Sequence, residues 1–209
     1  MKTNTNGFTM VEVALVIAIA GLIFGMTFAI VPNILANERD SERREDMISF
    51  ISTLQDYQQN NSRGNLPGQT KAEQEDLADN KRVIVEGQKV LDDRAGELDP
   101  SFSNISWGGF YRDYFTDTFE DPAGYPYNLE VMNCENTAAA ARLELGNPCT
   151  ASSLQNDINK TVTMQDKSFP IYIVIGASCD GSTPVKTASN RQIAAIVRTE
   201  RSGPYCFEN

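Results

Sequence analysis

The residues from Gly7 to Ala36 read GFTMVEVALVIAIAGLIFGMTFAIVPNILA, and this stretch decides how the rest of the chain is organised. No charged residue occurs from Val13 to Val31. A helix of about 19 residues extends roughly 28 Å, which matches the hydrocarbon thickness of a bilayer. One acid, Glu12, stands at the start of the run, behind a polar leader with one basic residue. An interpretation has to account for both the length and the acid.

Three interpretations of this run explain only part of it. A cleaved secretory signal has a shorter apolar core and small residues at positions −3 and −1 of the cut, whereas the candidate cut after Ala36 has the bulky Ile34 at −3. A plain single-pass anchor explains the length but gives Glu12 no role. A core helix of a soluble protein is disfavoured because the run is apolar on every face.

The fourth interpretation rests on Gly7, Phe8 and Glu12, which precede an unbroken apolar tail. This arrangement resembles the class III leader of type IV pilins and pseudopilins. The resemblance implies that a prepilin peptidase cuts between Gly7 and Phe8 on the cytoplasmic side of the membrane. It also implies that the same enzyme then methylates the new amino terminus, giving N-methylphenylalanine at Phe8. We adopt this interpretation because it uses every residue of the stretch.

The negative charge of Glu12 needs a partner if this segment lies in a membrane. A lone carboxylate in the apolar part of a membrane costs a few kcal/mol unless it is paired or reaches the interface. Two roles are open: Glu12 extends to the lipid headgroups, or it pairs with the amino terminus of Phe8 on a neighbouring subunit. In a filament core of low dielectric the second attraction is much stronger than in water. It would favour one axial stagger between subunits.

The composition excludes several classes of function. The chain has 209 residues, a net charge of −10 and no histidine. A dedicated nucleic-acid surface needs clustered Lys and Arg. Catalytic Ser-His and Cys-His arrangements and the usual zinc sites need imidazole. No pair of carboxylates stands out as an acid and base, so we expect no enzymatic activity and no cofactor.

The four cysteines all lie in the C-terminal part, at Cys134, Cys149, Cys179 and Cys206. None forms a CxxC pair, which disfavours a zinc site. An even number of cysteines fits an oxidising compartment outside the cytoplasm. Three connectivities are possible. We favour Cys134–Cys149 and Cys179–Cys206, because each bridge closes a loop that forms a unit.

The charges on either side of the apolar run disagree with the leader and the cysteines about which side of the membrane the C-terminal part lies on. Only Lys2 precedes the run, whereas Arg39, Arg43 and Arg44 follow it closely. The positive-inside rule alone would keep the C-terminal part in the cytoplasm. We place it outside, because the leader and the cysteines both require that orientation.

The sequence divides into a leader at 1–7, an apolar membrane or filament-core helix at 8–36, an amphipathic continuation at 37–60 and a globular domain at 61–209. Gly21 and Gly25 each lower helix propensity by about 1 kcal/mol relative to Ala. Pro32 removes a backbone donor, which predicts a kink near residues 28–32. In several filaments of the resembling family the helix melts between a glycine and a proline, so a melted segment would lie at Gly21–Pro32.

Residues 38–46, ERDSERRED, are nearly all charged. We expect a solvated helix face with one favourable pair, Asp40–Arg44. The alternative is charge complementarity between neighbouring subunits. From residue 47 the character changes, because Met47, Phe50 and Leu54 recur at helical spacing. Together with Ile51 they predict one apolar face that packs on the globular domain.

The globular part shows three strand candidates, at Tyr127–Met132, Phe169–Ile175 and Arg191–Arg198. A turn is expected at 176–183 and a short helix at 136–147. The aromatic cluster at 107–119 is expected in the core. Residues 121–127, DPAGYPY, resemble the D-P-W-G-x-P-Y turn of major pseudopilins and related pilins, with Ala123 in place of Trp.

One candidate metal site comes from carboxylates near that turn. Asp113, Asp117, Glu120 and Asp121 offer the oxygen ligands that calcium prefers. Their spacing matches no known calcium loop, and the calcium ligands of secretion pseudopilins have no counterpart here. We therefore expect no metal.

These observations predict an α+β fold in which a long N-terminal helix packs on a small antiparallel sheet, as in pilins. The resemblance implies a structural subunit of a type IV pilus used in adhesion, motility or DNA uptake. Before assembly it would span the cytoplasmic membrane once, and afterwards it would lie in a surface filament. Its partners would be the prepilin peptidase, a platform protein, an assembly ATPase and other pilins. The alternatives are a type II secretion pseudopilin, a minor tip pilin, and an anchored adhesin or sensor that does not polymerise.

Overall fold

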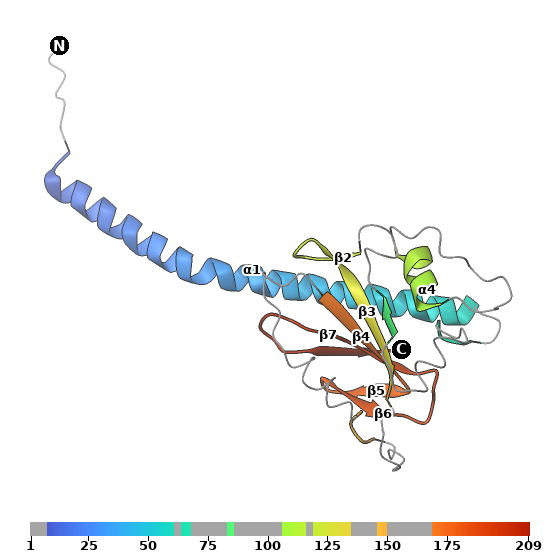
Figure 1. Ribbon diagram of the computed structural model, residues 1–209. Helices are drawn as coiled ribbons and strands as arrows, with labels where there is room; N and C mark the ends of the chain where they lie inside the picture. Colours follow the sequence, from blue (N-terminus) through green and yellow to red (C-terminus); the bar gives the residue numbers. More distant parts are fainter. Residues whose placement is uncertain are drawn as a thin grey trace. The chain divides into compact units, whose positions relative to one another are not determined.

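The computed structural model describes residues 8–60, 64–67, 83–85, 106–115, 119–134, 146–149 and 169–209 (Figure 1). The elements in chain order are α1 (Met10–Asn60), β1 (Val83–Val85), α4 (Trp107–Tyr114), β2 (Glu120–Asp121), β3 (Tyr125–Asn133), β4 (Phe169–Ile175), β5 (Ala177–Asp180), β6 (Thr183–Lys186), β7 (Ile193–Val197) and β8 (Tyr205–Glu208). The chain forms two compact units, one ending at Glu38 and the other extending from Arg39 to Asn209. The division falls inside α1, so the outer half of this helix belongs to the globular unit.

The first unit consists of the apolar half of α1. The helix continues without interruption through Gly21, Gly25 and Pro32, so the melted segment considered from the sequence is not formed in the single chain. One proline removes one backbone donor, and the intact turns on either side maintain the helix. Melting of this segment on assembly stays a prediction.

The second unit is built on a mixed sheet with strand order β1-β3-β4-β7-β8, in which β2 also pairs with β3. Figure 1 shows β3, β4 and β7 of this sheet beside the outer half of α1. The expectation of an antiparallel sheet is wrong at its centre, because β3 and β4 run parallel with Leu129 opposite Ile171. The other strand pairs of this sheet are antiparallel. Parallel neighbours need a crossover of a dozen or more residues, and residues 134–168 provide it.

The outer half of α1 and the short α4 cover one face of the sheet. Met47, Phe50 and Leu54 are fully buried there, as their helical spacing predicts. Trp107 and Phe110 of α4 are also fully buried, so the expectation that the aromatic cluster forms core is confirmed. The sheet contributes alternate residues to the same core, namely Tyr127, Leu129, Val131, Phe169, Ile171, Ile173, Ile193, Ala195 and Val197.

The opposite face of the sheet is covered by the β5–β6 hairpin. The expectation of a turn at 176–183 is therefore wrong in part, because residues 177–180 form a strand. The chain reverses between Asp180 and Thr183, and Gly181 in this turn has a φ of +61°. A second buried cluster lies beneath the hairpin and includes Tyr172, Val174 and Ile196. Since β4 buries both of its faces, it is the central strand that its apolar sequence predicts.

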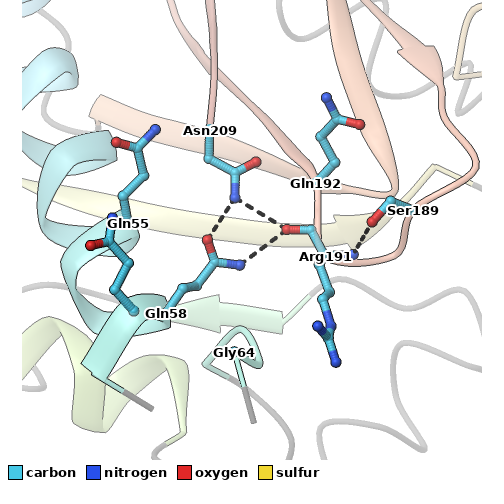
Figure 2. Close-up of a pocket in the computed structure, with 8 residues that line it drawn as sticks. Gln55, Gln58, Gly64, Ser189, Arg191, Gln192 and Asn209 are labelled. Carbon is cyan, nitrogen blue, oxygen red and sulfur yellow. Dashed lines mark hydrogen bonds between the residues drawn. The ribbon is translucent and has the colours of Figure 1, made fainter. Parts of the chain in front are cut away.

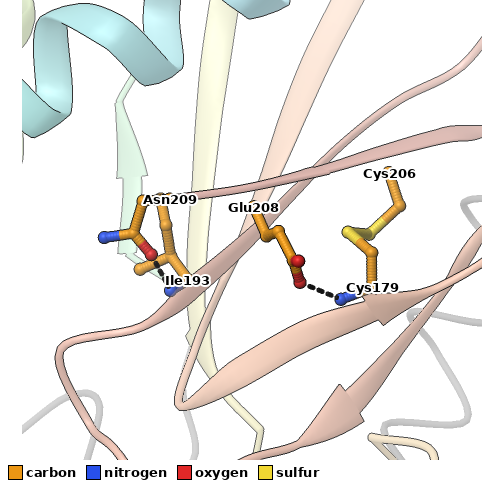
Figure 3. Close-up of a disulfide and its surroundings, with 5 residues drawn as sticks. All are labelled: Cys179, Ile193, Cys206, Glu208 and Asn209. Atoms are coloured by element: carbon orange, nitrogen blue, oxygen red, sulfur yellow. Dashed lines mark hydrogen bonds between the residues drawn. A yellow bond between two sulfur atoms is a disulfide. The ribbon is translucent and has the colours of Figure 1, made fainter.

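Two disulfides close the structure on this side, Cys134–Cys149 and Cys179–Cys206. They are the two pairs that the sequence favoured. The second joins β5 to β8, and the Glu208 side chain of β8 accepts a hydrogen bond from the backbone N–H of Cys179 at 2.9 Å (Figure 3). The last strand is thus held both covalently and by hydrogen bonds.

The remaining sequence expectations have mixed outcomes. The strand expected at 127–132 lies within β3, and the one expected at 191–198 contains β7. The helix expected at 136–147 falls largely outside the described residues, and Gly146 begins a described turn with φ +82°. β8 and the helical state of α4 were not predicted.

Candidate functional site

The N-terminal end of α1 carries a capping box made by Thr9 and Glu12. The backbone N–H and the hydroxyl of Thr9 each donate to Glu12 Oε2 at 2.8 Å. In return the Glu12 N–H donates to Thr9 Oγ1 at 3.3 Å. A Thr-x-x-Glu spacing satisfies helix-end donors in this way, and a carboxylate is also favoured at the positive end of the helix dipole. The acid therefore has a partner within its own chain, and Thr9 was missed although its spacing was visible in the sequence.

The residues nominated for processing lie immediately before this cap. Gly7 is outside the described residues. Phe8 is described, and 89% of its surface is exposed. The peptide bond between them precedes the helix, which begins at Met10.

The apolar half of α1 exposes its side chains on every side. Large apolar residues from Phe8 to Leu35 are between 41% and 91% exposed. Around Gly21 and Gly25, apart from the neighbouring backbone of the helix itself, no described atom lies within 4 Å of an added Cβ. α1 is long and apolar enough to cross a membrane, and it is the one described helix that meets this criterion. An exposed apolar surface of this extent is typical of a membrane anchor, a signal sequence or a protein-interaction site.

Polar groups inside this apolar half are satisfied within the helix. The Thr27 hydroxyl donates to the carbonyl of Ile23 at 2.9 Å, and the Asn33 amide donates to the carbonyl of Ala29 at 3.2 Å. In hydrocarbon no water is present to bind such groups, so intrahelical partners remove a cost of several kcal/mol. The two polar side chains are therefore compatible with an apolar environment.

A buried ion network lies where α1 enters the globular unit. The Arg43 guanidinium is fully buried and contacts Asp121 through Nε at 2.6 Å and Nη2 at 3.0 Å. Its Nη1 atom contacts Asp40 at 3.0 Å and Glu200 at 3.1 Å. Arg39 forms a second two-bond pair with Glu200, at 2.8 and 2.6 Å. Three distant parts of the chain, namely α1, β2 and the loop after β7, meet at these five side chains.

Hydrogen bonds and neighbouring charges favour the charged forms of Arg43 and Glu200 in this network. Burial alone lowers the pKa of Arg43, but its hydrogen bonds and charge interactions with Asp121 and Glu200 outweigh this and raise it. The hydrogen bond from Arg39 lowers the pKa of Glu200. Asp40 also accepts the backbone N–H groups of Glu200 at 2.8 Å and Arg201 at 3.1 Å. Buried charges of this kind are tolerated because each has several partners.

Residues 38–46 thus differ from the solvated face that their composition indicates. Asp40 and Arg43 are buried at 1% and 0% exposure. The expected pair Asp40–Arg44 is replaced by Asp40–Arg43, and Arg44 instead lies over the ring of Tyr205 at 3.8 Å. The outward face carries Glu38, Glu42 and Glu45, which are exposed. In this charged segment, one face of the helix therefore joins the buried ion network and the other face is exposed to solvent.

The DPAGYPY turn forms the β2–β3 connection and delivers Asp121 to the network. Asp121 accepts hydrogen bonds through its side chain from the Ala123 N–H at 2.9 Å and through its carbonyl from the Gly124 N–H at 2.7 Å. Gly124 adopts φ +81°, which favours glycine. The turn thus fixes the carboxylate that holds Arg43.

Two of the four carboxylates considered as calcium ligands are already paired with arginines. Both oxygens of Asp121 are bonded to Arg43, and Asp113 pairs with Arg112 at 2.8 Å. Asp117 lies outside the described residues. In the described part of the chain no three candidate ligands are grouped to hold a metal ion.

Comparisons with protein-family models, curated proteins and solved structures return no match.

Proposed function

We propose that this chain is the structural subunit of a type IV pilus, processed at Gly7–Phe8 and assembled through the apolar half of α1. The observation that carries the proposal is the apolar half of α1, which exposes its large apolar side chains and begins near an acid. Lipid covers this surface before assembly, and copies of the same helix cover it afterwards. Since lipid tails are as apolar as the helix, packing and ion pairing drive the transfer rather than apolar burial.

The capped position of Glu12 fits this scheme. In the single chain its carboxylate is held by Thr9 at the start of the helix. On assembly the amino terminus of Phe8 from a neighbouring subunit supplies a full positive charge at the same place. A full charge in a low-dielectric bundle binds the carboxylate more strongly than neutral donors do.

The globular unit fits an exposed position outside the cytoplasm. The buried ion network connects α1 to β2, and Cys179–Cys206 joins β5 to β8. A second disulfide, Cys134–Cys149, ties the end of β3 to Cys149. Disulfides persist in oxidising compartments. The unit therefore carries the stabilising features expected of a surface-exposed subunit.

Intact-mass spectrometry of the protein from its native membrane tests the proposal. The expected mass lacks residues 1–7 and carries one added methyl group. A mature chain that still begins at Met1 would contradict it, and would instead favour an anchored domain that does not polymerise.

A second candidate within the same superfamily is a pseudopilin of a type II secretion system. The DPAGYPY sequence at 121–127 favours it, because that turn resembles the one in major pseudopilins. Imaging of intact cells separates the two, since a pilus subunit gives long extracellular filaments and a pseudopilin at native expression gives none. A minor tip subunit would appear at filament ends only.

A further inference from the structure

The two ends of α1 are held in different ways. At the C-terminal end, the Gln58 side chain donates to the Arg191 carbonyl at 3.1 Å and accepts from Asn209 Nδ2 at 2.7 Å (Figure 2). At the N-terminal end, the side-chain hydrogen bonds that the structure describes join Thr9 and Glu12 to each other. The position of the Glu12 carboxylate is therefore set within the first turn of the helix and does not depend on the globular unit.

The capping box uses one of the two carboxylate oxygens of Glu12. Oε2 accepts from both the N–H and the hydroxyl of Thr9, each at 2.8 Å. Within the described part of the chain Oε1 accepts no hydrogen bond, and the Glu12 side chain is exposed. Each carboxylate oxygen can accept hydrogen bonds of its own. A donor from another molecule can therefore bind Oε1 while the bonds to Thr9 stay intact.

The same hydrogen bonds hold the peptide unit that precedes the helix. The planar peptide between Phe8 and Thr9 contains both the Thr9 N–H and the Cα atom of Phe8. Because this N–H is bonded to Glu12, the Cα atom of Phe8 is held relative to the helix. Under the proposed processing, that Cα atom carries the new amino group. One capping box thus positions both the acid and the amino end of the same subunit.

We propose that Thr9 is a positioning residue for assembly, whose hydroxyl orders Glu12 to receive the amino terminus of a second copy of this chain. This inference rests on the proposed function. Ordering the flexible Glu12 side chain before two subunits meet reduces the entropy that assembly would otherwise lose. The opposite role, in which Thr9 competes with the incoming amino group, is disfavoured because Oε1 is available. The two roles predict opposite effects when the hydroxyl is removed.

Filament yield per processed subunit tests the proposal, measured by immunoblots of the sheared and membrane fractions of cells that express the full chain. Thr9→Val keeps the branched shape and lacks the hydroxyl. We expect its yield to fall about fivefold, which corresponds to the typical cost of losing a threonine N-cap. Thr9→Ser keeps the hydroxyl and should restore the wild-type yield. Thr27→Val is the matched control, because the Thr27 hydroxyl bonds to the Ile23 carbonyl in the same apolar half.

A double variant separates positioning from a merely structural role. If Thr9 acts through the charge of Glu12, Thr9→Val should cause no further loss of yield in the Glu12→Gln background. A second loss of about fivefold there would mean that Thr9 acts on the helix itself, and it would overturn the proposal.

Unchanged yield in Thr9→Val would also overturn the proposal, and increased yield would do so by indicating competition. If Thr9→Val is not cut by the peptidase, Thr9→Ala decides. If neither variant is cut, Thr9 acts in processing and the proposal fails. These results differ from failure of the proposed function itself, in which the wild-type chain keeps Met1 or forms no filament.

Discussion

Arg43 shows how one residue can connect distant parts of this chain. Its guanidinium contacts three carboxylates that lie 3, 78 and 157 residues away in sequence. Replacing a buried ion network by apolar residues of similar volume can be neutral, but removing one member leaves charges buried without a partner. Loss of any one member of the network should therefore destabilise the globular unit by more than the intact ion pairs stabilise it.

The first prediction concerns Arg43→Met. The change leaves Asp121 buried without its cation, and we expect the free energy of unfolding to fall by about 3–5 kcal/mol. Urea unfolding of the full chain in detergent measures this loss through the fluorescence of the single tryptophan, Trp107, which is fully buried. Arg112→Met is the control, because the Arg112–Asp113 pair is partly exposed and its loss should cost less than about 1 kcal/mol. Equal effects of the two substitutions would contradict the prediction.

The second prediction concerns Asp46, which accepts a hydrogen bond from the Tyr127 hydroxyl at 2.9 Å. Burial, together with the charges of Asp121, Glu42 and Glu45, raises the pKa of Asp46 above its ordinary value of 3.8. The folded state thus binds this proton more tightly than the unfolded state, so ionised Asp46 lowers stability at neutral pH. This destabilisation disappears as the pH falls through the pKa of Asp46 in the folded state toward its ordinary value of 3.8.

Asp46→Asn should therefore raise the free energy of unfolding at pH 7, since Asn keeps an acceptor oxygen for Tyr127 and removes the charge. At about pH 3.5 the variant and the wild type should be equally stable. Urea unfolding at a series of pH values measures the difference. A variant that is less stable than the wild type at pH 7 would show that the ionised form is favoured in the folded state.

At the scale of elements, local patterns predict some features of this fold and not others. The period of Met47, Phe50 and Leu54 identified the buried face of α1, and the β-branched run at 169–175 identified β4, because each signal lies within one element. The parallel pairing of β3 with β4 and the partners of Arg43 were missed. Both depend on which distant segments meet, and hydrophobic periodicity carries no such information. Thr9 differs, because its capping box has a local signature.

The third prediction concerns β8, which lies at the edge of the sheet and is held by Cys179–Cys206. Removing the bridge in Cys179→Ser/Cys206→Ser should lower the free energy of unfolding by about 3 kcal/mol in the chain-entropy model, because the closed loop is of moderate length. Hydrogen exchange should increase most at Tyr205–Glu208. Unchanged exchange there, with equal stability, would show that the hydrogen bonds of Glu208 and Asn209 suffice to hold the strand.

At the scale of the whole molecule, the chain joins two units with opposite surface chemistry. The part up to Glu38 exposes apolar side chains and the part from Arg39 onward has its own core, sheet and ion network. Under the proposed function, the apolar part lies in lipid or in the filament core and the part from Arg39 onward lies in water.

The last prediction tests the passage from membrane to filament through Glu12→Gln. The variant keeps the side-chain oxygen that caps the helix with Thr9, so the helix and its membrane insertion should be unaffected. It loses the charge that would attract the amino terminus of Phe8 on a neighbour, and filament yield should fall at least tenfold while the processed subunit accumulates in the membrane. Glu42→Gln is the matched control, because Glu42 is an exposed acid of the same helix outside the apolar half, and it should assemble normally. Electron microscopy of sheared filaments and immunoblots of membranes give the two measurements. Normal yield from Glu12→Gln would mean that packing of the apolar surfaces suffices for assembly, and Glu12 would then serve only to begin the helix.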